Sequence, residues 1–80
     1  MKLGYYKQYD GKIYNVISIV KNGQTLEDMA ICYETKEYNQ HLAYPISVFK
    51  EKIKLNNNVY IYRFKKMEHL EILVPWIMKH

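Results

Sequence analysis

The segment Lys12-Ile-Tyr-Asn-Val-Ile-Ser-Ile-Val-Lys21 is rich in β-branched residues and lies between the dipeptides Asp10-Gly11 and Asn22-Gly23. Asp-Gly and Asn-Gly adopt the positive backbone angles of two-residue hairpin turns, whose twist matches that of the flanking strands. Both faces of the strand expected over Lys12–Val20 are mostly apolar, which is typical of a central strand covered on both sides. We therefore expect an antiparallel meander in the N-terminal half, with this strand in its middle.

Further strands are expected on either side of this central one. Gly4–Tyr9 precedes it and Leu26–Tyr33 follows it. A helix is the competing interpretation for the second of these segments, because Thr25-Leu-Glu-Asp28 resembles a capping box before an apolar run. The ending Ile31-Cys-Tyr33 and the preceding hairpin turn favour a strand.

The second half of the chain alternates short strand patterns with turn signals. Leu42–Pro45 is expected to be extended, because the residue before a proline avoids the helical region. Pro45 suits the first position of a helical turn over Ile46–Phe49, from which Phe49 would enter the core. The other expected elements are a loop over Glu34–Gln40, a strand over Glu51–Leu55, a turn at Asn56–Asn58 and a strand over Val59–Phe64.

From Lys65 onward the apolar residues change to a helical period. They are Met67, Leu70, Leu73, Val74 and Ile77. This spacing predicts an amphipathic helix over residues 66–80, bent at Pro75. We expect the helix to pack on the domain of residues 1–65 or on a second subunit, which would give a homodimer. Contact of its Trp76 end with a partner or a membrane is the alternative, and the mixed charge of its polar face argues against a membrane.

Composition indicates one small globular domain. The chain has 80 residues, of which 49% are apolar and 25% charged, close to the average for soluble domains. Cys32 is the only cysteine, so no internal disulfide is available and a reducing compartment is expected. The N-terminus lacks the apolar core of a signal peptide and no apolar run is long enough to span a membrane, so a cytoplasmic protein without membrane contact is expected.

These patterns together predict a mainly β fold. We expect a small SH3-like antiparallel β-barrel, or a strongly bent sheet of five to six strands, followed by the C-terminal helix.

Several fragments of the chain resemble a known family in their order and spacing. They are Tyr6-Lys-Gln-Tyr9 with Gly11, Tyr14-Asn-Val16, Thr25-Leu-Glu27, Tyr33, Pro45, Phe49 and Arg63-Phe64. Together they resemble the bacterial and phage domain-of-unknown-function family 1653, whose pattern runs YxHYKGxxYxV, ETxE, RPxxMF and PRF. The chain departs from this pattern at Gln8, Asp10, Tyr44 and Tyr62, where the family has His, Lys, Arg and Pro.

The resemblance extends over roughly residues 5–65 and implies a small, mostly β domain without implying a reaction. The family occurs in phage genomes, so the resemblance also implies a more specific function. By analogy, a phage member would sequester a nucleotide immune signal of its host or inhibit a host defence protein.

The net positive charge of the chain and the position of Arg63 in a strand pattern suggest an anionic ligand. There are 12 basic and 8 acidic residues, which gives a net charge of +4 and favours encounter with nucleotides, nucleic acids or acidic partners. Arg63 alternates with apolar residues in the last expected strand, and its guanidinium would hold a phosphate or carboxylate in a bidentate fork. The alternative is an internal ion pair with Glu27 or Glu51. Glu27 itself either orients Arg63 or lies on a solvated edge.

The tyrosines allow two interpretations. Flat rings on one exposed face would form a stacking platform for bases, and Tyr60 with Tyr62 is the best-placed pair. Tyrosine is also common in the cores of small β domains. The predicted ligand-binding residues are Lys7, Tyr9, Glu27, Tyr33, Tyr44, Tyr60, Tyr62 and Arg63.

The sequence favours binding over catalysis. It contains no glycine-rich phosphate loop, catalytic triad order or paired carboxylates, and Cys32 lies beside apolar residues without an activating base, as a core residue would. We expect a non-enzymatic module, without cofactor or metal, for a small anionic molecule such as a nucleotide. The alternatives are a single-stranded nucleic-acid-binding module, and a module that binds a host protein through the C-terminal helix.

Overall fold

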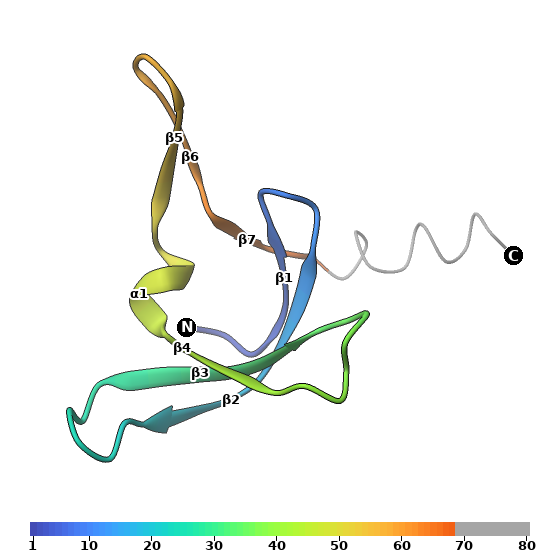
Figure 1. The fold of residues 1–80 in the computed structure, drawn as a ribbon, viewed down its shortest axis with the longest axis vertical. Coiled ribbons are helices and arrows are strands. Elements are labelled where there is room, and N and C mark those ends of the chain that lie inside the picture. Colours follow the sequence, from blue (N-terminus) through green and yellow to red (C-terminus); the bar gives the residue numbers. More distant parts are fainter. Residues whose placement is uncertain (69–80) are drawn as a thin grey trace, which may run out of the picture.

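A computed structural model describes residues 1–68 as two antiparallel sheets and one short helix (Figure 1). The main sheet has five strands in the order β4-β3-β2-β1-β7. Its strands are β1 (Gly4–Gln8), β2 (Ile13–Lys21), β3 (Asp28–Glu34), β4 (Leu42–Pro45) and β7 (Phe64–Lys66). The helix α1 (Ile46–Phe49) leads from β4 into a separate hairpin of β5 (Lys52–Asn56) and β6 (Val59–Tyr62). The expectations of a mainly β chain and of β2 as the middle strand are confirmed.

The two hairpin signals around β2 give longer turns than expected. The backbone N–H of Gln8 donates to the carbonyl of Lys12 (2.8 Å), so that three residues form the first loop, and Gly11 adopts a φ of +93° there, which a glycine allows without steric cost. In the second loop the N–H of Asn22 donates to the carbonyl of Glu27 (2.8 Å). The second loop is longer because the Asn22 carboxamide accepts from the backbone of Gln24 (2.9 Å) and of residue 25, which folds the chain locally.

A bulge changes the faces of β2. The pairing of β2 with β3 shifts between Val16 and Ser18, so that Ile19 rather than Ser18 continues on the face of Val16. The expectation that both faces of β2 are covered is wrong within the described residues, because the buried residues Tyr14 and Val16 lie on one face, whereas Val20 on the other face is exposed. The apolar pattern of this strand thus reflects a sheet buried on one face.

The core lies between one face of the main sheet and α1. Its buried side chains are those of Tyr6, Tyr14, Val16, Ala30, Cys32, Phe49 and Phe64. Phe49 enters from α1, as expected, and its ring centroid lies 4.4 Å from that of Phe64 and 5.3 Å from that of Tyr6. Aromatic rings in such edge and tilted contacts contribute about 0.5–1.5 kcal/mol per pair beyond the area they bury. Ring packing from four strands and α1 therefore holds this small domain together.

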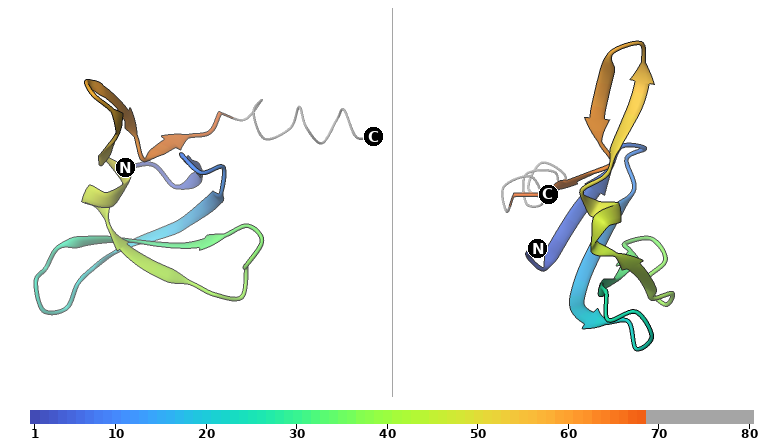
Figure 2. Two further views of the ribbon diagram at one scale, coloured as in Figure 1. Left: turned by 45° about the horizontal axis from the view of Figure 1, so that its top comes forward. Right: turned by 90° about the vertical axis from the view of Figure 1, so that its left-hand side faces the viewer.

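The strand expected over Val59–Phe64 is divided at Arg63 into β6 and β7. The N–H of Arg63 donates to the carbonyl of Glu51 (2.8 Å), at the base of the hairpin directly before β5, while the carbonyl of Arg63 accepts from the N–H of Tyr9 (2.9 Å) beside the main sheet. The backbone therefore changes partner at this one residue. Figure 2 shows the consequence, because the hairpin of β5 and β6 projects away from the main sheet in both views.

The expected closed barrel is not formed by the described residues. Strands β4 and β7 are the two edges of the main sheet, and β5 and β6 pair with each other instead of joining those edges. The expected C-terminal helix of residues 66–80 falls mostly outside the described residues, since β7 runs to Lys66 and the description ends at residue 68. No helix among the described residues is long and apolar enough to cross a membrane.

Candidate functional site

The β5–β6 hairpin has two chemically different faces because of its register. Lys52 lies opposite Tyr62, and Lys54 lies opposite Tyr60. Residues directly opposite each other in an antiparallel pair project from the same face, and residues two apart in one strand do so as well. All four side chains therefore share one face, which we call the lysine–tyrosine face, while the isoleucines opposite each other in the hairpin, Ile53 and Ile61, lie on the other.

The local sequence explains why the hairpin forms. Asn57 and Asn58 form its turn, and Asn58 has a φ of +69°, a left-handed conformation that asparagine tolerates better than most residues. The pairing shifts between Lys54 and Asn56, beyond the four side chains of interest. This shift sets the register of the lysine–tyrosine face, because without it the two-residue turn would place Leu55 opposite Tyr60 and Ile53 opposite Tyr62.

The lysine–tyrosine face is exposed and positively charged. Tyr60 and Tyr62 are 58% and 61% exposed, and residues 52–62 contain two lysines and no acidic residue. Neither ion pair found within residues 1–68 uses Lys52 or Lys54. The Lys52 ammonium lies 5.3 Å from the centroid of the Tyr62 ring, a distance at which a cation is attracted by the ring face. Rings and uncompensated cations therefore stand side by side.

Arg63 is engaged at the base of the hairpin. Its Nη1 donates to Glu51 Oε2 at 3.0 Å, and its guanidinium carbon lies 5.9 Å from the centroid of the Phe64 ring. Of the two expected ion-pair partners the structure selects Glu51. Arg63 Nε is the one buried side-chain polar atom without a hydrogen-bond partner in the described chain. The guanidinium is thus paired with a carboxylate and partly covered, beside the break between β6 and β7.

The structure does not gather the other expected site residues around Arg63. Tyr9 is near it through the backbone bond, whereas Tyr44 packs edge-on against the core rings of Tyr14 and Phe49. Tyr33 stacks on His41 at 5.6 Å and accepts a hydrogen bond from Asn15 at 2.9 Å.

Two charged site residues lie elsewhere in the fold. Glu27 is in the exposed turn between β2 and β3, which Figure 1 places at the opposite end of the molecule from β5 and β6. Lys7 lies on β1, in register with Ile13 on one side and Lys65 on the other. Of the expected site residues, Tyr60 and Tyr62 share the lysine–tyrosine face, with Arg63 directly after them in the chain.

The two lysines of the face are residues that sequence reasoning missed. Their signal was the alternation Lys52-Ile-Lys-Leu55 before an asparagine turn, which mirrors Val59-Tyr-Ile-Tyr62 after it. A two-residue turn at Asn57-Asn58 would by itself pair the tyrosines with Leu55 and Ile53, and it is the bulge at Leu55, which the alternation does not reveal, that brings the lysines opposite them.

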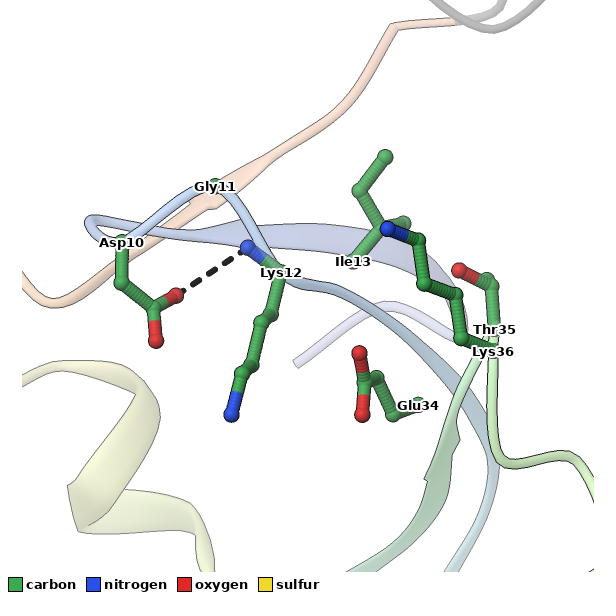
Figure 3. A pocket seen from close by; sticks show the side chains of 7 residues that line it. All are labelled: Asp10, Gly11, Lys12, Ile13, Glu34, Thr35 and Lys36. Carbon is green, nitrogen blue, oxygen red and sulfur yellow. Dashed lines mark hydrogen bonds between the residues drawn. The ribbon is translucent and has the colours of Figure 1, made fainter.

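A surface hollow of about 230 Å³ lies elsewhere, at the β1–β2 turn (Figure 3). Its lining includes two lysines, Lys12 and Lys36, and two acids, Asp10 and Glu34. Asp10 Oδ1 accepts from the backbone N–H of Lys12 at 3.0 Å, as Figure 3 draws it. The charges around the hollow are balanced, so it is a weaker attractor of polyanions than the lysine–tyrosine face.

Comparison with known proteins gives one match. No match was found among curated proteins or among solved structures. The family described as protein of unknown function DUF1653 matches over residues 4–66, a range that includes all strands of both sheets. The chain therefore belongs to the DUF1653 family, as its ordered fragments indicate.

Proposed function

We propose that this protein is a non-enzymatic binding module for an anionic ligand that carries a flat ring, with the chemistry of a nucleotide, and that the lysine–tyrosine face binds it. One observation carries the proposal. Lys52, Lys54, Tyr60 and Tyr62 share one exposed face of the β5–β6 hairpin, and residues 52–62 contain no acidic residue.

The residue types on this face match the two halves of a nucleotide. A tyrosine ring offers a flat surface on which a base stacks, worth about 1–3 kcal/mol per base. A lysine ammonium is a compact charge that attracts phosphate oxygens. Because each ring has a lysine directly opposite, base and phosphate are recognised within one cross-strand pair.

The contact between Lys52 and Tyr62 is compatible with a ligand. A cation over a ring at an exposed site contributes about 0.5–1 kcal/mol, less than a stacked base contributes. The lysine stem is flexible, so the ammonium can leave the ring face for a phosphate while a base takes its place.

The burial of the single cysteine supports binding without catalysis. Cys32 is fully buried in the core, and burial raises the pKa of its thiol to about 11, so the reactive thiolate is scarce at neutral pH. The four side chains of the face are lysines and tyrosines, which bind anions and rings. Sequestration of a nucleotide immune signal, expected from the occurrence of the family in phages, stays a prediction of this proposal.

A titration followed by amide NMR tests the proposal. Adenosine monophosphate is expected to shift the amide resonances of β5 and β6 at low salt, with a dissociation constant on the order of 1 mM, since one stacked base and one phosphate supply only a few kcal/mol. Inorganic phosphate and adenosine, each offering half of the chemistry, are expected to bind more weakly.

A charge-matched pair of variants serves as the control. The double variant Lys52→Ala/Lys54→Ala should weaken adenosine monophosphate binding, whereas Lys36→Ala/Lys50→Ala removes the same charge from exposed positions outside the hairpin and should leave it nearly unchanged. Equal losses in both double variants, or shifts confined to the hollow around Lys12, would refute the lysine–tyrosine face as the site.

A further inference from the structure

We infer that the ligand is a single-stranded nucleic acid of at least two nucleotides rather than a free nucleotide. The inference rests on the proposed function and names its substrate class. The inference depends on a repeat in the hairpin. Lys52 lies opposite Tyr62, and two residues further along, Lys54 lies opposite Tyr60. Each pair offers one ring and one cation.

A repeating site fits a repeating ligand. Residues two apart in a strand are separated by about 6.6 Å along it, so the two ring-and-cation pairs form a ladder with that step. A nucleic acid strand likewise repeats one base and one phosphate per unit. A free nucleotide would engage one pair and leave the other without a function.

The spacing of the rings favours single strands over duplexes. Bases in a duplex follow each other at about 3.4 Å along each strand and keep their flat faces stacked on one another. Bases placed on Tyr60 and Tyr62 must be separated to about twice that distance, which requires an extended, unstacked strand. Single-stranded binding proteins use successive aromatic side chains in this way.

The openness of the face leads to the same ligand class. Sites for small molecules enclose most of the ligand surface, whereas Tyr60 and Tyr62 are 58% and 61% exposed on a projecting hairpin. The hollow at the β1–β2 turn is lined by residues 10–13 and 34–36, away from the hairpin. An open ladder gains affinity from the number of units engaged, and a polymer supplies that number.

A length series tests the inference. Oligothymidylates and oligouridylates one, two, four and eight nucleotides long are titrated into the full chain, followed by amide NMR and tyrosine fluorescence. We expect affinity to rise by roughly tenfold from one to two nucleotides, as the second stacked base is added, and little thereafter. A self-complementary duplex of eight base pairs should bind more weakly than the single strand of equal length.

The salt dependence gives an independent measure of the contacts. Two lysine–phosphate contacts predict a slope of about −1.4 for the logarithm of the association constant against that of salt concentration, and either Lys52→Ala or Lys54→Ala should reduce its size by about 0.7. A slope near zero, with affinity intact, would overturn the phosphate ladder.

Ring-preserving variants separate stacking from loss of fold. Tyr60→Ala and Tyr62→Ala should each weaken binding of the four-nucleotide strand by about 5- to 100-fold, whereas Tyr60→Phe and Tyr62→Phe keep the flat ring and should bind nearly as wild type. Binding of the single nucleotide as tight as that of the longer strands overturns this inference and leaves the proposed function standing. Absence of binding to every length, including the single nucleotide, overturns both.

Discussion

Tyr62 and Phe64 are two residues apart in a strand that the sequence predicts as continuous, yet they belong to different regions of the molecule. Phe64 is 5% exposed in the core of the main sheet, and Tyr62 is 61% exposed on the hairpin. The residue between them, Arg63, hydrogen-bonds to the hairpin with its N–H and to the Tyr9 end of the main sheet with its carbonyl. The same alternation of aromatic residues thus places one ring at the surface and the other in the core, because the partner strands decide which face of a strand is covered.

The comparison suggests a division of labour between the two regions. The main sheet carries the buried aromatic core, and no residue of β5 or β6 is buried within the described structure. Side chains that contribute little to stability are free to serve a ligand. We therefore expect substitutions in the sheet to act on folding, and those on the lysine–tyrosine face to act on binding.

The largest expected effect is that of Phe64→Ala. Loss of this ring removes contacts with Phe49 and Tyr14, and truncation of a buried phenylalanine costs about 3–5 kcal/mol. Tyr62→Ala, two residues earlier, should cost at most about 1 kcal/mol, since its ring is exposed. Urea unfolding of the two variants measures the difference.

A milder variant keeps this test decisive if Phe64→Ala fails to fold. Phe64→Leu keeps an apolar side chain but leaves a cavity in the core, so it should lower the free energy of unfolding by less than Phe64→Ala and by more than Tyr62→Ala. If Tyr62→Ala were as destabilising as Phe64→Ala, the hairpin would be part of the cooperative core and the division into two regions would be wrong.

The second effect concerns the alkaline stability of the main sheet. Burial raises the pKa of the Cys32 thiol from 9.0 to about 11. Between these values the unfolded chain loses this proton while the folded chain keeps it, so the free energy of unfolding falls as pH rises, by about 1.4 kcal/mol per pH unit and about 2–3 kcal/mol in all. Below pH 9 the thiol contributes no pH dependence. Urea unfolding at pH 8, 10 and 11 measures the slope.

The Cys32→Ala variant isolates the thiol from other groups. Burial also raises the pKa values of Tyr6 and Tyr14, and those contributions remain in the variant above pH 10. The variant should therefore lose less stability than wild type between pH 8 and 10. Equal losses in the two proteins would show that the thiol titrates normally and that the core at Cys32 is open to water.

Local signals predicted the parts of the fold that depend on neighbours in sequence. Pro45 followed by Ile46–Phe49 gave α1 with its expected bounds, and Phe49 entered the core. The asparagine turn gave the β5–β6 hairpin. In each case the chemistry of two or three adjacent residues fixes the backbone.

Features that depend on distant partners were not predictable in the same way. The break at Arg63 requires the N–H of Tyr9, more than fifty residues earlier, and the bulge between Val16 and Ser18 appears only in the pairing with β3. An unbroken strand over Val59–Phe64 would have carried the hairpin into one curved sheet. The break instead separates the two sheets, which is why the barrel expectation failed.

Part of the candidate site was predictable from local sequence, and part depended on strand pairing. Tyr60 and Tyr62 alternate within one strand, so their common face follows from local geometry. The contribution of Lys52 and Lys54 needs the register of a second strand. Tyr33 and Tyr44 were grouped with them by residue type, and Glu27 by its place in the strand expected over Leu26–Tyr33. The fold places all three in other surroundings, with Glu27 before the start of β3.

The smallest expected effect tests the junction between the two regions. The Arg63 and Glu51 side chains are 33% and 49% exposed, and ion pairs of that exposure contribute about 0–1 kcal/mol. A double-mutant cycle of Arg63→Met and Glu51→Gln, measured by urea unfolding, should give a coupling energy within that range. Glu51→Gln should destabilise more than Arg63→Met, because it leaves a partly covered guanidinium without its carboxylate, whereas methionine also removes the unpartnered Nε.

The same Arg63→Met variant distinguishes the junction from the proposed ligand site. The backbone bonds from Arg63 to Glu51 and from Tyr9 to Arg63 do not involve the side chain, so the hairpin keeps its attachment and the lysine–tyrosine face keeps its register. Adenosine monophosphate binding should then be unchanged within about twofold, well below the loss expected from a removed phosphate contact. A large loss of affinity with intact amide spectra of β5 and β6 would move the anion site from the face of the hairpin to its base, where the guanidinium would have to exchange Glu51 for the ligand.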